Sequence, residues 1–177
     1  MNDHTQATLP EVTDHLTDGT TLYIRPINPN DAESDQHFIE ALSPESRRFR
    51  FLAQIAHPSD KMVEQLTSLN PNIAIALVGS VLTEGAKELI AVARYSVGPG
   101  PAECECAVSV MDKWQRHGAG TILMRRLMEI ARVRGMESMW SLDYAANASM
   151  SAFAGSLGFK RTVDAADASQ VFHRCKL

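Results

Sequence analysis

The spacing of apolar and polar residues changes several times along the chain. Apolar and polar side chains alternate over Thr21–Ile27, which predicts a strand. The segments that follow carry helix-start signals instead. Pro29 precedes a run with acidic residues in its first turn, Ser43 precedes Pro44, and Ser59 precedes an apolar periodic run. We therefore expect one strand followed by three helices.

The middle of the chain has the composition of strands. Three segments are rich in β-branched and other apolar residues, namely Asn72–Leu82, Leu89–Val97 and Glu103–Val110. The polar stretch TEGAKE between the first two predicts a hairpin turn, and GPGPA before the third predicts a loop.

The last third returns to alternating elements. Apolar spacing of 3.6 residues predicts a helix from Gly120 to about Arg134, stopped by Gly135. ESMWSLDY is expected as a strand, NASMSAFAGSL as a helix ending at Gly158, and KRTVDA and SQVFHRCKL as closing strands. This order predicts an α/β (α+β) fold with a single mixed, mostly antiparallel central sheet flanked by helices. Residues 1–19 are polar and unpatterned and are expected to be a loose N-terminal leader before one domain, residues 20–177.

Composition narrows the class of protein. The chain has 177 residues, of which 45% are apolar and 21% charged, with a net charge of −4 and no block of lysine and arginine. These values favour a soluble cytoplasmic domain and argue against a nucleic-acid or membrane partner. The three cysteines have neither disulfide-framework nor zinc spacing, so we expect reduced thiols and no metal site. Cys104 and Cys106 are interpreted as small core residues.

The stretch QRHGAGTILMRRLM carries the first chemical signal. Gly118–Gly120 lead directly into the amphipathic helix, where free main-chain N–H groups and small side chains favour a bound anion. A nucleotide P-loop would need lysine after the last glycine, where this chain has Thr121, and a dinucleotide fingerprint would need glycine at Leu123. The alternative is a glycine-rich helix start without a ligand.

Two motifs resemble those of the GCN5-related N-acetyltransferases. Gln115-x-x-Gly118-x-Gly120, between a strand and an amphipathic helix, resembles the acetyl-CoA motif of that family. Asn147, eleven residues before Gly158-Phe159, resembles its second signature. TLYIRPINPNDAE is similar to the family's opening strand and helix, and LSPESRRFRF to the acetyltransferase domain of bacterial protein lysine acetyltransferases.

The resemblance implies a GNAT-like acyl-CoA fold that takes acetyl-CoA as co-substrate. The pantetheine arm would pair with Val108 to Val110, and Asn147 would contact the arm, although a plain helix cap is the alternative for Asn147. The pyrophosphate would lie on main-chain N–H groups of six residues: Arg116, His117, Gly118, Ala119, Gly120 and Thr121. For the His117 side chain we favour a contact with phosphate, or no special role, over catalysis.

The resemblance also assigns the base of the reaction. An ammonium has no lone pair, so a group must remove a proton before the amine attacks the thioester. Glu105 aligns with the general base of the lysine acetyltransferase relatives, and burial would raise its pKa. Glu103 on the same strand face is a weaker candidate, and ordinary solvent-facing residues are the alternative for both.

The chain departs from the family at the general acid. Many members place a tyrosine seven residues after the helix-cap asparagine, where this chain has Ala154, and Tyr144 is expected to serve core packing. We expect an N-acetyltransferase acting on a primary amine, either a protein lysine or a small amine, as a monomer or homodimer. The departure at Ala154 suggests water-assisted or acid-free collapse. It also keeps an alternative open, a catalytically weak acyl-CoA-binding regulatory or sensor domain.

Overall fold

The computed structural model describes residues 9–100 and 102–177 and contains one eight-stranded sheet in the order β1-β2-β3-β4-β5-β6-β8-β7. Among its neighbouring pairs only β5 and β6 run parallel, so the expected mixed, mostly antiparallel sheet is confirmed. The strands are β1 (Val12–His15), β2 (Thr21–Pro26), β3 (Ala74–Thr83), β4 (Ala86–Val97), β5 (Glu103–Val110), β6 (Ser138–Tyr144), β7 (Lys160–Val163) and β8 (Gln170–Lys176).

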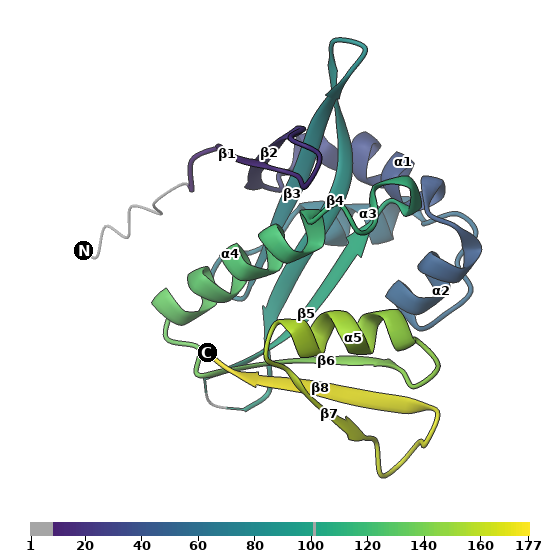
Figure 1. Ribbon diagram of the computed structural model, residues 1–177, viewed down its shortest axis with the longest axis vertical. Coiled ribbons are helices and arrows are strands. Elements are labelled where there is room, and N and C mark those ends of the chain that lie inside the picture. Colours follow the sequence, from purple (N-terminus) through teal and green to yellow (C-terminus); the bar gives the residue numbers. More distant parts are fainter. Residues whose placement is uncertain (1–8, 101) are drawn as a thin grey trace.

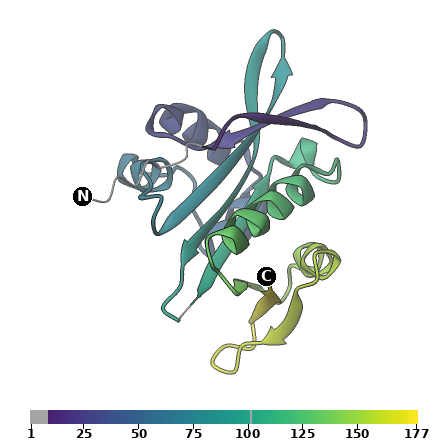
Figure 2. The same ribbon diagram turned by 90° about the vertical axis from the view of Figure 1, so that its left-hand side faces the viewer.

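Helices cover both faces of this sheet. Figure 2 shows the helices of the first half on one side of the long central strands and α4 on the other. In Figure 1, α4 and α5 lie on the near face. The helices are α1 (Ala32–Ala41), α2 (Pro44–Phe51), α3 (Asp60–Thr67), α4 (Ala119–Val133) and α5 (Ala148–Ser156), with short 3-10 turns at η1 (Pro29–Asp31) and η2 (Asp112–Trp114).

Side-chain caps explain where several helices begin. Ser43 Oγ accepts a hydrogen bond from Ser46 N (3.1 Å), and Ser59 Oγ accepts one from Met62 N (3.2 Å). Each bond satisfies one of the N–H groups that a helix start leaves without a partner. The expected starts of α2 and α3 are therefore confirmed. The segment after Pro29 first forms a 3-10 turn and becomes α-helical only afterwards.

Part of the expected loose leader belongs to the sheet. Residues 12–15 form β1, which pairs with β2, and Leu16 is 3% exposed in the core. The prediction was wrong here because four residues carry too little periodicity to be recognised, whereas β2 supplies the hydrogen-bond partners that hold the strand. The first eight residues of the expected leader lie outside the described part of the chain.

The hairpin between β3 and β4 is tighter than expected. TEGAKE was expected as a turn, but the two strands pair up to Thr83 and Ala86 and leave only Glu84 and Gly85 between them. Both turn residues have positive φ angles, 52° and 85°. Two-residue turns of this kind match the twist of the flanking strands. The polar residues on either side of Glu84 and Gly85 can therefore still pair between β3 and β4.

The apolar face of α4 forms much of the core. Leu123 and Leu127 are fully buried and pack with Val78 of β3 and Ile90 of β4 in one apolar cluster. Cys104 and Cys106 are buried in the same cluster, which confirms that they are core residues, and all three cysteines are free thiols. This packing fixes where the first turn of α4 meets the sheet.

The parallel pair β5–β6 separates part of the way along. Their pairing ends at Glu105 and Trp140. Beyond that point β5 stays paired with β4 up to Val110, and β6 stays paired with β8 up to Tyr144. Figure 1 shows the two strands diverging. The sheet therefore opens along its middle and leaves one edge of each strand without a strand partner.

Candidate active site

A cavity of about 550 Å³ occupies the opening between β5 and β6. Its walls are the second half of β5, the end of β6, helix α2, and the first turns of α4 and α5. Nine of the ten residues predicted for the site line it: Glu105, Val108, Val110, Arg116, Gly118, Ala119, Gly120, Thr121 and Asn147. The structure therefore brings together residues that are far apart in the sequence.

His117 is the predicted site residue that does not line the cavity. Its Nδ1 lies 2.9 Å from Gln115 O, and its ring stands edge-on to Trp114 at 5.7 Å between centroids. Its main-chain oxygen accepts a hydrogen bond from Thr17 N at 3.0 Å. The turn after β1 thus supports the glycine turn from outside, a contact that sequence patterns did not indicate.

The glycine turn presents unpaired amide groups to the cavity. Ile122 N donates to Gly118 O at 3.0 Å, the first hydrogen bond of α4, so N–H groups before Ile122 have no helical acceptor. Gly118 has φ = 95°, a conformation that costs other residues about 1–3 kcal/mol, and Arg116 also has a positive φ of 63°. Main-chain amides and the helix dipole make this turn suitable for a phosphate group.

Asp112 ties the approach to this turn to helix α2. Its carboxylate accepts hydrogen bonds from Ser43 N (2.9 Å), Ser43 Oγ (2.8 Å) and Ser46 Oγ (2.8 Å). Burial acts to raise the pKa of Asp112, but the hydrogen bonds from the two serines outweigh it and lower the pKa below its usual range. Sequence reasoning missed Asp112 because its partners lie more than sixty residues away.

Asn147 combines a capping bond with a position on the cavity wall. Its Oδ1 accepts hydrogen bonds from Met150 N and from Ser149 Oγ, both at 3.0 Å, so the capping role is present. Both bonds use Oδ1, which leaves the Nδ2 donors for the cavity that Asn147 lines. The same side chain can therefore start α5 and contact a ligand.

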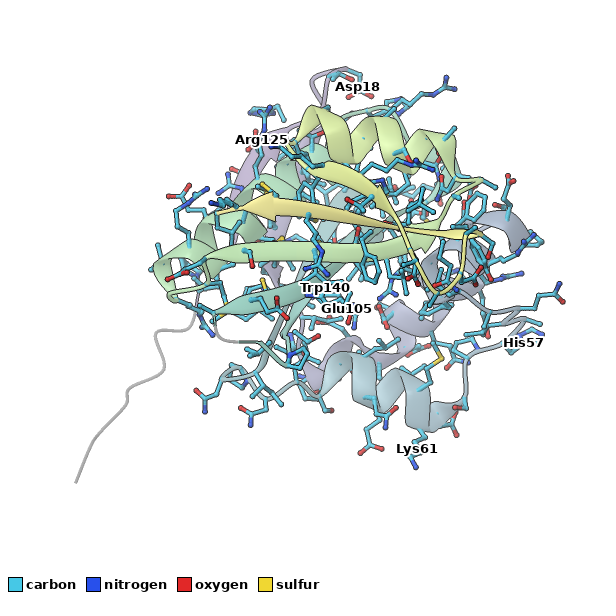
Figure 3. All side chains as sticks on the ribbon, turned by 90° about the horizontal axis from the view of Figure 1, so that it is seen from below. Asp18, His57, Lys61, Glu105, Arg125 and Trp140 are labelled. Atoms are coloured by element: carbon cyan, nitrogen blue, oxygen red, sulfur yellow. The ribbon has the colours of Figure 1, made fainter. Side chains whose placement is uncertain are left out.

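The two glutamates of β5 differ sharply in their surroundings. Glu105 lines the cavity, and Figure 3 shows it beside Trp140, where β5 and β6 separate. Glu103 does not line the cavity, and its Oε1 accepts a hydrogen bond from Gly100 N at 3.2 Å. Only Glu105 is therefore placed to meet a reactant in the cavity.

Arg50 of α2 modulates the charge of Glu105. Partial burial raises the pKa of Glu105 above its ordinary value, and the Arg50 guanidinium opposes this shift. The pKa of Arg50 is itself lowered by burial and by Arg94, while Asp35, Glu105 and Asp143 act to raise it. Glu105 therefore stays near a cation while part of its hydration is removed.

Tyr144 holds helix α2 against the end of β6. Its hydroxyl donates to Leu52 O at 3.1 Å, its ring lies 6.2 Å from that of Phe49, and Arg48 lies over it at 5.0 Å. It does not line the cavity, so it links two walls rather than packing in the core as expected.

We expect Tyr144→Phe to weaken this link without changing the chemistry. Losing one hydrogen bond lowers the free energy of unfolding by about 0.5–1.5 kcal/mol. Denaturant unfolding would measure this decrease, and calorimetry would show unchanged affinity for CoA. A large loss of CoA binding would contradict the assignment of Tyr144 to the α2 wall.

Comparison with known proteins defines the class. The model of the acetyltransferase (GNAT) family matches residues 38–159, and the chain belongs to that family. It is 37% identical over 162 residues to an acetyltransferase from Pseudomonas aeruginosa, covering 92% of this chain and 87% of the relative.

Solved structures agree with this family. The GNAT domain of S. lividans PAT matches with a TM-score of 0.85 and 29% identity, over 94% of this chain and 97% of that one. PaiA N-acetyltransferase from Thermoplasma acidophilum, solved in complex with coenzyme A, matches with a TM-score of 0.64 and 14% identity, over 88% and 99%, and at that identity supports the fold alone.

Two further features bear on the site. Within the described ranges, no group of three or more His, Cys, Asp or Glu side chains is arranged to hold a metal ion. Across the same residues, no helix has both the length and the apolar character needed to cross a bilayer. By family and fold the chain is an acetyltransferase of the GNAT type, and its cavity joins the amide-rich turn to the Glu105 carboxylate.

Proposed function

We propose that this chain transfers the acetyl group of acetyl-CoA to a primary amine, with Glu105 as general base. The observation that carries the proposal is the continuity of one cavity from the amides of Gly118–Thr121 to the Glu105 carboxylate. A diphosphate bound at the turn would direct the pantetheine arm along Val108 and Val110. The thioester would then lie where β5 and β6 separate.

The residues that line the cavity support a direct attack. Glu105 has a raised pKa, so it is a stronger base than an ordinary glutamate once it has lost its proton. The amine would lose its proton to Glu105 and attack the thioester carbonyl carbon, and the C–S bond would then break. The free edge of β5 and Nδ2 of Asn147 would hold the pantetheine arm during this step.

The acceptor approaches through the wall formed by α2. This wall contributes Glu45, Phe49 and Arg50 to the cavity. It therefore presents a negative charge, an aromatic ring and a positive charge to an acceptor. The similarity to the GNAT domain of S. lividans PAT, together with the LSPESRRFRF motif in α2, makes a protein lysine the first acceptor to test, followed by small amines.

A thiol-release assay tests the proposal. Acetyl-CoA is mixed with the protein and with a panel of lysine-containing proteins, peptides and small amines, and free CoA thiol is measured. We expect release that depends on one class of amine. Tight CoA binding in calorimetry without release on any amine would instead identify the alternative, an acyl-CoA-binding regulatory or sensor domain.

The charge of Arg50 leads to a prediction about pH. The base works only when deprotonated, so kcat/KM falls as pH drops through the raised pKa of Glu105. Arg50 lowers that pKa. We therefore expect Arg50→Met to move the acidic limb of the kcat/KM profile to higher pH. Arg125→Met, on the exposed face of α4, should leave the limb in place. A limb that moves to lower pH would contradict the assignment.

A further inference from the structure

The β6 side of the cavity carries a second carboxylate besides Glu105. Asp143 is 9% exposed and lines the cavity beyond the point where β5 and β6 separate. Its Oδ2 accepts a hydrogen bond from Ser141 Oγ at 2.6 Å, and Nδ1 of His173 lies 2.8 Å from the same oxygen. Among the residues that the structure describes, both hydrogen bonds of this side chain end on Oδ2. The other oxygen, Oδ1, is therefore left for the cavity.

The carboxylate is held in one orientation by its neighbours. His173 of β8 pairs across the sheet with Ser141 of β6 and is 1% exposed. Its Nε2 lies 3.2 Å from Ser151 Oγ on α5. A carboxylate oxygen only accepts hydrogen bonds, so Nδ1 of the imidazole donates to Asp143, and Nε2 of the neutral ring can accept from the Ser151 hydroxyl. These contacts restrict rotation of the Asp143 side chain, so that Oδ1 keeps its direction.

The charge of Asp143 determines the kind of ligand group it can meet. An ionised carboxylate accepts hydrogen bonds and cannot donate one. The Arg50 guanidinium, which also lines the cavity, interacts favourably with this charge. A buried acceptor that loses its water without gaining a donor is costly, and more so when it is charged. A ligand that fills the cavity is therefore expected to bring a hydrogen-bond donor to Oδ1.

The pantetheine arm of CoA carries donors of this kind. It contains amide groups, each with one N–H donor and one C=O acceptor, and it has no positive charge. In the proposed binding mode the free edge of β5 lies on one side of the arm, and the wall of β6 and α5 lies on the other. On that second wall, Asn147 Nδ2 is a donor that suits a C=O group of the arm. Asp143 Oδ1 is an acceptor that suits an N–H group.

We propose that Asp143 Oδ1 accepts a hydrogen bond from an amide N–H of the pantetheine arm, and that Ser141 and His173 hold the carboxylate in place for this contact. The inference rests on the proposed function, because it takes CoA as the ligand of the cavity. Asp143 and Asn147 then supply one acceptor and one donor on the wall opposite β5. Ser141 and His173 are positioning residues, since they act through Asp143.

Calorimetry with two ligands tests the contact. CoA contains the arm, whereas 3′-phospho-ADP contains the same nucleotide and diphosphate without it. We expect Asp143→Asn to weaken the Kd for CoA by about 10- to 100-fold, the range for a hydrogen bond to a charged group. The single oxygen of asparagine would stay with the donors Ser141 and His173, so an N–H group would face the N–H of the arm.

The second ligand separates a contact with the arm from a general disturbance of the site. The Kd of Asp143→Asn for 3′-phospho-ADP should equal that of the wild type, because the glycine turn that would hold the diphosphate is untouched. Asp60→Asn is the matched control, since Asp60 is exposed at the start of α3 and does not line the cavity. It should bind both ligands like the wild type.

Three results would overturn the contact. Wild-type affinity for CoA in folded Asp143→Asn would mean that Oδ1 does not bind the arm. Equal losses for CoA and 3′-phospho-ADP would mean that the substitution disturbs the whole site. Unchanged affinity for CoA with a raised KM for the amine would assign Asp143 to the acceptor instead.

A second variant decides the question if Asp143→Asn does not fold. Ser141→Ala keeps the charge of Asp143 but releases its carboxylate, so we expect weaker binding of CoA and unchanged binding of 3′-phospho-ADP. Unchanged binding of CoA in Ser141→Ala would then overturn the proposal. A wild-type protein that binds CoA but releases no thiol on any amine would contradict the proposed transfer reaction and not this contact. A wild-type protein that does not bind CoA would contradict both.

Discussion

Replacing Glu105 by glutamine is expected to lower kcat by about 10²- to 10³-fold, because general base catalysis contributes an effect of this size. Glutamine keeps the shape of the side chain but cannot accept a proton from an ammonium. The KM for acetyl-CoA should stay the same, since the pyrophosphate turn is untouched. Initial rates of thiol release over a range of both substrates would separate the two parameters.

The neighbouring glutamate provides a sharp control for this experiment. Glu103 lies two residues earlier on β5 but is hydrogen-bonded to Gly100 N and does not line the cavity. Glu103→Gln should therefore retain its activity, as should Glu129→Gln on the exposed face of α4. Equal losses in Glu105→Gln and Glu103→Gln would indicate damage to β5 rather than removal of a base.

Filling the glycine turn is expected to remove most of the affinity for CoA. A Cβ at Gly120 would already lie 3.4 Å from Val110 Cγ2 and 3.5 Å from the Phe153 ring. The longer side chain of Gly120→Leu has no space except towards the cavity or against these neighbours. Overpacking of this kind costs about 1–3 kcal/mol, which corresponds to about a 5- to 150-fold weaker Kd if the cost falls on the bound state.

Isothermal calorimetry with CoA measures this effect, and the CoA-induced rise in melting temperature provides a second readout. Gly155→Leu is the matched control, because Gly155 lies on the exposed surface of α5 with no atom within 4 Å of an added Cβ. It should bind CoA like the wild type. Unchanged affinity in Gly120→Leu would place the phosphate outside the turn and remove the basis of the proposed function.

Local signals in the sequence determined most of the fold. The 3.6-residue spacing of α4, the serine caps of α2 and α3, and the β-rich runs of β3 to β6 each act within a few residues, so periodicity and capping reveal them. The glycine turn and Glu105 were also singled out from the sequence, and the structure places both on the wall of one cavity. They meet there because β5 and α4 are consecutive elements of the chain.

The tertiary structure decided what depends on partners far away in the sequence. Strand β1 exists because β2 holds it, and Asp112 and Tyr144 bind α2 through contacts with residues more than sixty positions away. The position of Glu105, and not of Glu103, on the cavity wall depends on the point where β5 and β6 separate. No local sequence pattern encodes the place where these strands separate. It results from β5 continuing to pair with β4 while β6 continues to pair with β8.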